Sequence, residues 1–160
     1  MTKEETYKYL KEHNVEFEIT EHEAVFSMGE LGSVTLPYPE WDAKNLFVRD
    51  DKKKNYYLIT VRGNKRVDLK EFRKKHGLRN LSFASPEDLA EMLCVAPGSV
   101  SPLGLLCDKE CRVHFYLDSE YEGNKIGIHP NDNTATVWLK TDDLVRIIKE
   151  HGNTMEYAEI

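Results

Sequence analysis

Cysteine is scarce in this sequence, and its scarcity excludes one class of protein. Three cysteines stand among 160 residues, an odd number that cannot all pair within one chain. Small secreted domains held together by disulfides carry a denser and usually even set. The sequence therefore predicts a protein of a reducing compartment with no disulfide framework.

Long hydrophobic runs are missing as well. No stretch approaches the roughly 20 consecutive apolar residues that a membrane span needs. The opening MTKEETYKYLKEHN is polar and charged, unlike a secretory signal. We expect a cytoplasmic protein with no membrane partner, and the length predicts a single domain over residues 1–160.

The net charge of −6 hides an uneven distribution. Residues 44–79 hold 13 of the 22 Lys and Arg residues but four of the 28 Asp and Glu residues. A basic segment on an acidic body is a candidate contact surface for phosphates. A solvated helix and turn with no binding role explains the same charges equally well.

Helix caps and hydrophobic alternation predict a mixed order of elements. We expect helices near 2–13, 27–32, 68–76, 85–93 and 141–151, and strands near 15–22, 43–50, 56–63, 81–83, 112–118, 125–128 and 134–139. Hairpins and isolated helices in this order favour an α+β fold over regular winding of parallel strands.

The stretch AKNLFVRD, residues 43–50, raises a specific question. In a strand, Lys44 shares a face with Leu46 and Val48. A lysine on an apolar face needs a partner, or its stem must carry the ammonium group out to solvent. We expect either a snorkelling surface lysine or one that binds an anion.

The three cysteines suggest a zinc site or a catalytic thiol, and the sequence supports each interpretation only weakly. Cys107, Cys111 and His114 could supply three zinc ligands, but no fourth is evident. A catalytic thiol needs a nearby base, and none stands close in sequence to Cys94 or the others. We interpret the cysteines as small buried hydrophobic residues.

Two loops are candidates for a functional site. In PGSVSP, residues 97–102, Gly98 and the flanking prolines could present backbone amides to an oxyanion or a phosphate, although most Pro-Gly pairs are plain turns. His129 stands where a strand breaks at Pro130, a place where histidine is more often structural than catalytic. Residues 131–133 could be simple turn formers.

Taken together, AKNLFVRD, YYLITV, PGSVSPLGLL and HPNDNTATVWL resemble the stand-alone prolyl-tRNA editing domain of the YbaK/ProX type. Their order and spacing cover roughly residues 2–150. The resemblance implies an α+β fold whose mixed β-sheet curls into a barrel-like core surrounded by helices. The KNLF form of the lysine motif resembles the branch that removes alanine wrongly attached to proline tRNA.

The resemblance also implies a set of site residues. The family lysine falls on Lys44, the loop glycine on Gly98 and the histidine on His129, which we expect to be catalytic. Asn45 and Ser99 are expected to contact the substrate.

Three further positions complete the comparison with the family. Met28 lies in a short stretch that resembles the helix over the pocket mouth, and it is expected to bind substrate. Cys94 replaces an expected glycine, and Ala96 stands where threonine is common, so the loop differs in detail.

The implied reaction is hydrolysis of the ester between an amino acid and the terminal ribose of tRNA, with no covalent intermediate, metal or other cofactor. Lys44 would bind a phosphate, and the amides of Gly98 and Ser99 would hold the carbonyl oxygen while a ribose hydroxyl helps to activate water. The partners would be proline tRNA charged with alanine and prolyl-tRNA synthetase. A deacylase for cysteine on proline tRNA, or a non-catalytic module that binds aminoacyl-tRNA or a synthetase, are open alternatives.

Overall fold

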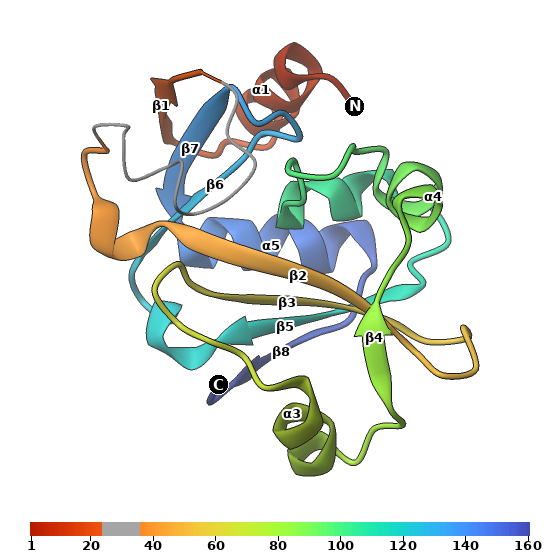
Figure 1. The fold of residues 1–160 in the computed structure, drawn as a ribbon. Helices are drawn as coiled ribbons and strands as arrows, with labels where there is room; N and C mark the ends of the chain where they lie inside the picture. The colour runs from red at the N-terminus through yellow and green to blue at the C-terminus, as the bar shows by residue number, and fades with distance from the viewer. Residues whose placement is uncertain (24–35) are drawn as a thin grey trace.

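Two β-sheets form the centre of the computed structural model, which describes residues 1–23 and 36–160 (Figure 1). One sheet is antiparallel with the order β1-β7-β6, and the other is mixed with the order β4-β2-β3-β5-β8. The strands are β1 (Phe17–Glu21), β2 (Ala43–Asp50), β3 (Tyr56–Arg62), β4 (Leu81–Phe83), β5 (Val113–Asp118), β6 (Lys125–Ile128), β7 (Ala135–Lys140) and β8 (Met155–Ala158).

The helices begin where local capping chemistry predicts them. The side chains of Thr2, Asp68 and Ser85 each accept a backbone amide of the first turn. The α-helices are α1 (Lys3–Glu12), α3 (Leu69–His76), α4 (Pro86–Asp88) and α5 (Thr141–His151), and the shorter helical turns are η1 (Pro39–Trp41), η2 (Leu89–Leu93), η3 (Pro102–Cys107) and η4 (Ser119–Tyr121). Among the described residues, no helix has both the length and the apolar character that crossing a lipid bilayer requires.

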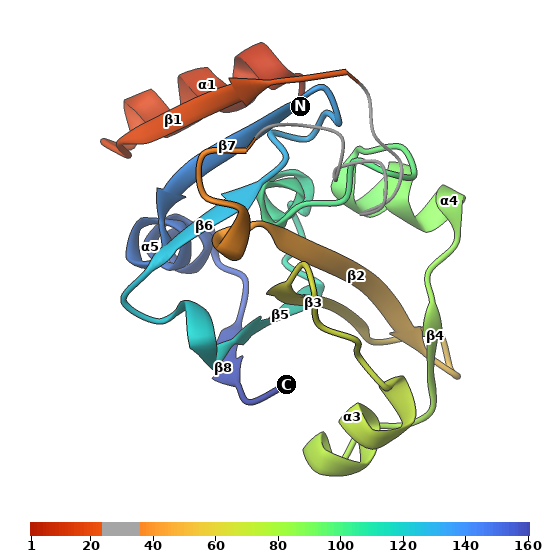
Figure 2. The ribbon, with the colours of Figure 1, turned by 60° about the vertical axis from the view of Figure 1, so that its left-hand side comes forward.

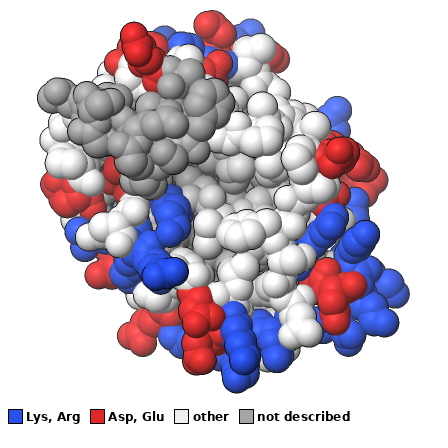
Figure 3. Space-filling model, in the orientation of Figure 1, with Lys and Arg blue, Asp and Glu red and all other residues white. Residues whose placement is uncertain are grey.

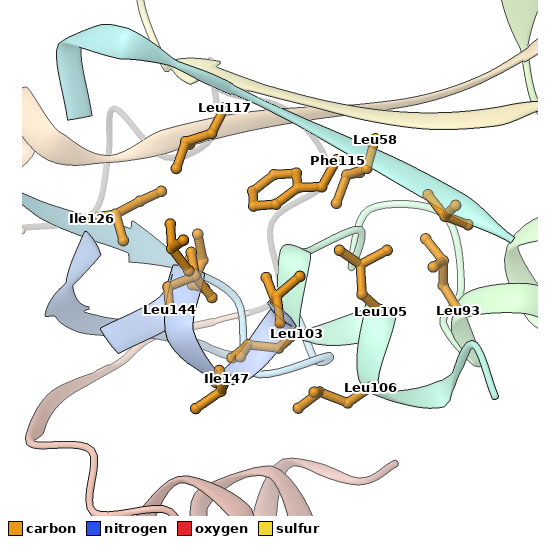
Figure 4. Packing of buried hydrophobic residues seen from close by; sticks show 14 of the residues in the cluster. Leu58, Leu93, Leu103, Leu105, Leu106, Phe115, Leu117, Ile126, Leu144 and Ile147 are labelled. Atoms are coloured by element: carbon orange, nitrogen blue, oxygen red, sulfur yellow. The ribbon is translucent and has the colours of Figure 1, made fainter. Parts of the chain in front are cut away.

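The mixed sheet carries a hydrophobic cluster on each of its faces. On one face, side chains of β3 and β5 pack with η2, η3, β6 and α5, and Figure 4 shows Leu58 and Phe115 lying over Leu103 and Leu144. On the other face, Val48, Ile59, Val61 and Tyr116 pack with Phe72 of α3. Figure 2 shows α3 and α5 on opposite sides of this sheet.

Within residues 1–23 and 36–160, a single isolated bridge joins the two sheets at the start of β2. Asp42 pairs with Gly127 of β6 in a parallel bridge, and Tyr121 donates its hydroxyl to the Asp42 carbonyl at 3.1 Å. Gly127 is required there because a Cβ atom would overlap the ring of Trp138. The expected α+β class with a mixed sheet is confirmed, and within the described residues the two sheets do not close into a barrel.

The structure departs from the predicted elements in three places. The segment expected as a loop over 94–105 contains η3, and the predicted helix over 85–93 becomes a π-helical turn at η2. Strand β8 was not expected, and it pairs in parallel with β5. The helix predicted near 27–32 lies outside the described residues.

Asp42 carries a buried carboxyl group at this bridge. The residue is 5% exposed, and its Oδ2 atom has no hydrogen-bond partner in the described part of the chain. Burial raises the pKa of Asp42 to about 7, although a hydrogen bond from the Ala43 amide acts in the opposite direction. The folded protein therefore favours the protonated form of Asp42 at pH values below about 7.

Asp42→Asn should remove a pH-dependent component of stability. Because the folded state holds its Asp42 proton more tightly than the unfolded state, the free energy of unfolding should fall as pH rises from about 4 through about 7. This rise in the pKa of Asp42 corresponds to a loss in the free energy of unfolding on the order of 4 kcal/mol between acidic and mildly alkaline pH. Urea unfolding of wild type and Asp42→Asn at acidic and mildly alkaline pH measures it.

The exposed carboxylate of Asp142 provides the control. Asp142→Asn should keep the wild-type loss of stability toward alkaline pH, whereas Asp42→Asn should flatten it. Parallel pH profiles for wild type and Asp42→Asn would contradict a protonated Asp42.

Candidate active site

His129 lies directly after β6 and is held by a backbone carbonyl. Its Nδ1 atom is 2.9 Å from the Ala135 oxygen. Because a carbonyl can only accept, Nδ1 carries the hydrogen and Nε2 keeps a lone pair. Burial lowers the pKa of His129, so the ring is neutral at pH 7. The site thus offers a neutral acceptor at this position.

A second histidine, which the sequence analysis missed, lies beside His129. The ring centroids of His22 and His129 are 6.1 Å apart in an edge-on arrangement. The Nδ1 atom of His22 lies 2.8 Å from the Glu23 carbonyl, so Nε2 accepts from the Thr136 hydroxyl at 3.0 Å. Only the pairing of β1 with β7 brings His22 here, and no local pattern signals that pairing.

The glycine loop has the expected turn but fewer available amides than expected. Gly98 has a φ of +91°, which requires glycine. The Ser99 amide donates to the Ala96 carbonyl at 3.1 Å, so it is already occupied within the turn. The role of the Ser99 amide toward a carbonyl oxygen of the substrate stays a prediction. In the described part of the chain, no backbone acceptor is found for the Gly98 amide.

Asn131 anchors the loop after β6 to the rest of the molecule. Its Nδ2 group donates to the Thr6 hydroxyl at 3.2 Å and to the Leu103 carbonyl at 3.4 Å. The residue is buried, so it is more than the simple turn former that we expected. It ties the segment around His129 to α1 and to η3, which follows the glycine loop.

Lys44 has a partner, but the face on which it lies is not a pocket wall. Its Nζ atom donates to the Lys65 carbonyl at 2.8 Å. Leu46 and Val48, on the same face of β2, pack into the cluster under α3. The alternation along β2 was predicted correctly, and it places Lys44 on the face of the strand that packs under α3.

Asn45 points to the opposite face of β2. The Thr60 hydroxyl donates to its Oδ1 atom at 2.6 Å, which fixes the orientation of the amide. The amide nitrogen is therefore the group that Asn45 can offer to a ligand. Met28, the other side chain expected to bind substrate, lies outside the described residues.

The fold brings some of these elements together and separates others. The bridge between Asp42 and Gly127 places the start of β2 beside the end of β6, just before Asn45 and His129. Figure 2 shows the start of β2 next to β6 and the loop before η3 on the same side of the mixed sheet. The Lys44 side chain projects from the other face, toward the α3 side.

The cysteines do not build a metal site. His114 hydrogen-bonds to Thr154 and Glu156, and Cys111 lies against His151. No group of three metal-ligating side chains is found within residues 1–23 and 36–160. Cys94 is exposed, so its interpretation as a small buried residue is wrong.

The basic segment is partly neutralised within the protein. Arg49 pairs with Asp88 at 2.6 Å, and Lys65 pairs with Asp118 and Glu120 at 2.6 Å each. Lys52–Lys54, in the turn between β2 and β3, are exposed and make no salt bridge with any described residue. Figure 3 shows basic side chains gathered at the lower right and lower edges of this face, near this turn and α3.

Comparison with known proteins points to one family. The family model of the aminoacyl-tRNA editing domain matches residues 22–147. The prolyl-tRNA editing protein ProX of Acetoanaerobium sticklandii is 36% identical over 94% of this chain and 93% of its own length. The prolyl-tRNA synthetase associated domain-containing protein 1 of Mus musculus is 37% identical over 85% of this chain and 83% of its own.

A solved structure shares the fold. The crystal structure of "a putative trans-editing enzyme for prolyl tRNA synthetase" superposes with a TM-score of 0.72 and 19% sequence identity. The alignment covers 99% of this chain and 96% of that one.

Proposed function

The chain belongs to the aminoacyl-tRNA editing domain family and is an editing hydrolase of that family, and we propose that its substrate is proline tRNA wrongly charged with alanine. The observation that carries the proposal is the 36% identity with a prolyl-tRNA editing protein over nearly the whole of both chains. The choice of alanine rests on the Lys44-Asn45-Leu46-Phe47 motif, which resembles the alanine branch.

The geometry around His129 suits recognition of a neutral hydrogen-bond donor. A ribose hydroxyl of the terminal nucleotide can donate to Nε2, because Nδ1 is already committed to Ala135. His129 then positions the substrate without taking up a charge. The amide nitrogen of Asn45 and the amide of Gly98 are further donors, and the Gly98 amide is suited to a carbonyl oxygen that becomes negative during attack.

Lys44 retains a role as a phosphate contact in this proposal. A lysine ammonium group has three N–H donors, and one of them is used by the Lys65 carbonyl. The remaining two can contact a phosphate near the 3′ end, acting as a point charge. The hydrogen bond to Lys65 holds the ammonium group in place before the substrate arrives.

The proposal extends to the domain organisation of the protein and to its partners. Residues 1–160 would act as one editing domain in the cytoplasm, with charged tRNA as substrate and prolyl-tRNA synthetase as a partner. The bridge between the two sheets fits the barrel-like curvature that we expect of the family fold. The proposed hydrolysis uses no cofactor.

A deacylation panel tests the proposed substrate. Wild-type protein should release alanine from proline tRNA quickly and release proline almost not at all, because a narrow site rejects a larger side chain by overpacking. His129→Ala should either admit larger residues or slow alanine release. His114→Ala, a histidine on β5, is the matched control and should behave as wild type.

The panel also separates the alternatives. Faster release of cysteine than of alanine would identify the cysteine branch. Retained tRNA binding with no release of any amino acid would identify a non-catalytic module. If the wild type and His129→Ala hydrolyse and discriminate equally, His129 is structural.

Lys44→Met should fold and lose roughly 100-fold in single-turnover deacylation, since misplacing a substrate by about 1 Å costs that much. Methionine keeps most of the stem that packs on β2 and removes the charge. Circular dichroism reports the fold, and Lys8→Met on the exposed face of α1 is the control. A folded Lys44→Met protein with a near wild-type rate would remove Lys44 from the site.

Binding of tRNA should weaken steeply with salt despite the net charge of −6, because phosphate contacts release counterions. Charge reversal at Lys52–Lys54 should flatten the dependence of log affinity on log salt by about 0.7 to 0.9 for each phosphate that the variant no longer neutralises. Filter binding over a salt series measures the slope.

A control carries the same charge change elsewhere on the surface. The control variant replaces Lys8, Lys11 and Lys149 by Glu, all of them exposed. If both triple variants change the slope equally, the turn between β2 and β3 is not a specific contact surface.

A further inference from the structure

Cys94 and Cys107 lie together at one cavity, although neither belongs to the site described above. Both line a surface cavity of about 360 Å³, together with Met92 and Arg112. The Cys94 side chain is close enough to contribute to the raised pKa of Cys107. Cys111 lies elsewhere, against His151. Two of the three cysteines are therefore neighbours that share access to solvent.

The two thiols differ in their exposure to solvent, so we expect them to react with an oxidant in a fixed order. Cys94 is exposed, whereas Cys107 is partly buried and accepts from the amino group of Met1 at 3.6 Å. Burial, together with the nearby Cys94 side chain, raises the pKa of the Cys107 thiol. An oxidant from solvent therefore meets Cys94 first, with Cys107 next to it as a second thiol.

The backbone at Cys94 is unusual for a residue with a side chain. Cys94 ends η2 in the left-handed region with a φ of +59°, a position where glycine is common. Its amide donates to the Leu89 carbonyl, which closes the turn. Cys94 lines the same cavity as Cys107, which is the last residue of η3.

We propose that Cys94 and Cys107 are a redox modification site, at which a hydroperoxide forms a reversible disulfide that joins the end of η2 to the end of η3, on either side of the glycine loop. The 12 residues between the two cysteines include Gly98 and Ser99. The bond would therefore enclose the loop that we place at the reacting carbonyl. Its regulatory meaning rests on the proposed function, whereas its formation does not.

The chemistry balances with hydrogen peroxide as the oxidant. The Cys94 thiol attacks the peroxide, so that a sulfenic acid forms and one water molecule leaves. The Cys107 thiol then attacks the sulfenic sulfur, which forms the S–S bond and releases a second water molecule. Two thiols are oxidised and one peroxide is reduced, and a dithiol reductant reverses the reaction.

Tryptic mass mapping tests bond formation directly. No Lys or Arg lies between Asn80 and Asp108, so Cys94 and Cys107 fall in the single peptide 80–109, while Cys111 falls in the next peptide. After peroxide treatment and alkylation, the peptide 80–109 should lack two hydrogens and carry no alkyl group, and dithiothreitol should reverse this. Cys111 should stay free and alkylated.

Three serine variants make the result specific. Cys94→Ser and Cys107→Ser should each prevent the closed peptide, and Cys111→Ser should form it as readily as wild type. A peptide 80–109 that stays doubly alkylated, or a disulfide that involves Cys111, would overturn the proposal.

Deacylation of alanine-charged tRNA tests the regulatory consequence. The oxidised wild type should hydrolyse about tenfold or more slowly, because the loop can no longer adjust around the reacting carbonyl. Dithiothreitol should restore the rate, and peroxide should leave Cys94→Ser unaffected. A closed peptide with an unchanged rate would overturn the regulatory role. If untreated protein shows no deacylation, the proposed function fails, and the mass result still decides the disulfide.

Discussion

The arrangement of the candidate site depends on one contact, the bridge between Asp42 and Gly127. Among the described residues, no other β-bridge is found between the antiparallel sheet that carries His129 and the mixed sheet that carries Asn45. The bridge is possible because Gly127 leaves room for the Trp138 ring, and it places the Asp42 carboxyl group where burial raises its pKa to about 7. The close approach of the two sheets thus comes with a buried acid, which lowers the free energy of unfolding at alkaline pH.

The side chains at the candidate site have fixed hydrogen-bonding orientations. His129 is neutral with a fixed tautomer, and Thr60 orients Asn45. Such fixed donors and acceptors need no reorganisation when a substrate enters, which is the condition for electrostatic stabilisation of a developing oxyanion. An aminoacyl ester is activated already, so positioning and a few directed hydrogen bonds are a reasonable means of catalysing its hydrolysis.

Local chemistry in the sequence predicted most elements of the fold. The caps at Thr2, Asp68 and Ser85 and the alternation along β2 depend on neighbours within a few residues, so they can be read from short stretches. Strand β8 was missed because its four residues make a strand only beside β5. Cys94 was misjudged because free cysteines are usually buried, whereas this one lies exposed at a left-handed turn.

In the candidate site, too, some features follow from short sequence motifs and others from tertiary packing. The positions of the lysine, the loop glycine and the histidine follow from motifs, and their roles stay predictions. Which face of β2 packs under α3, which amide the turn at Ser99 uses, and that His22 lies beside His129 all depend on tertiary packing. No short-range pattern contains that information.

The pairing of β1 with β7 constrains when this protein can fold. Phe17 pairs with Leu139, so β1 is synthesised long before its partner strand β7. On the ribosome, β1 and the apolar side of α1 must therefore wait, unpaired, until β7 has been made. Contacts this distant in sequence slow folding, since a long loop must close before any bond forms. The antiparallel sheet, and the His22 and His129 pair with it, is thus a late product of assembly.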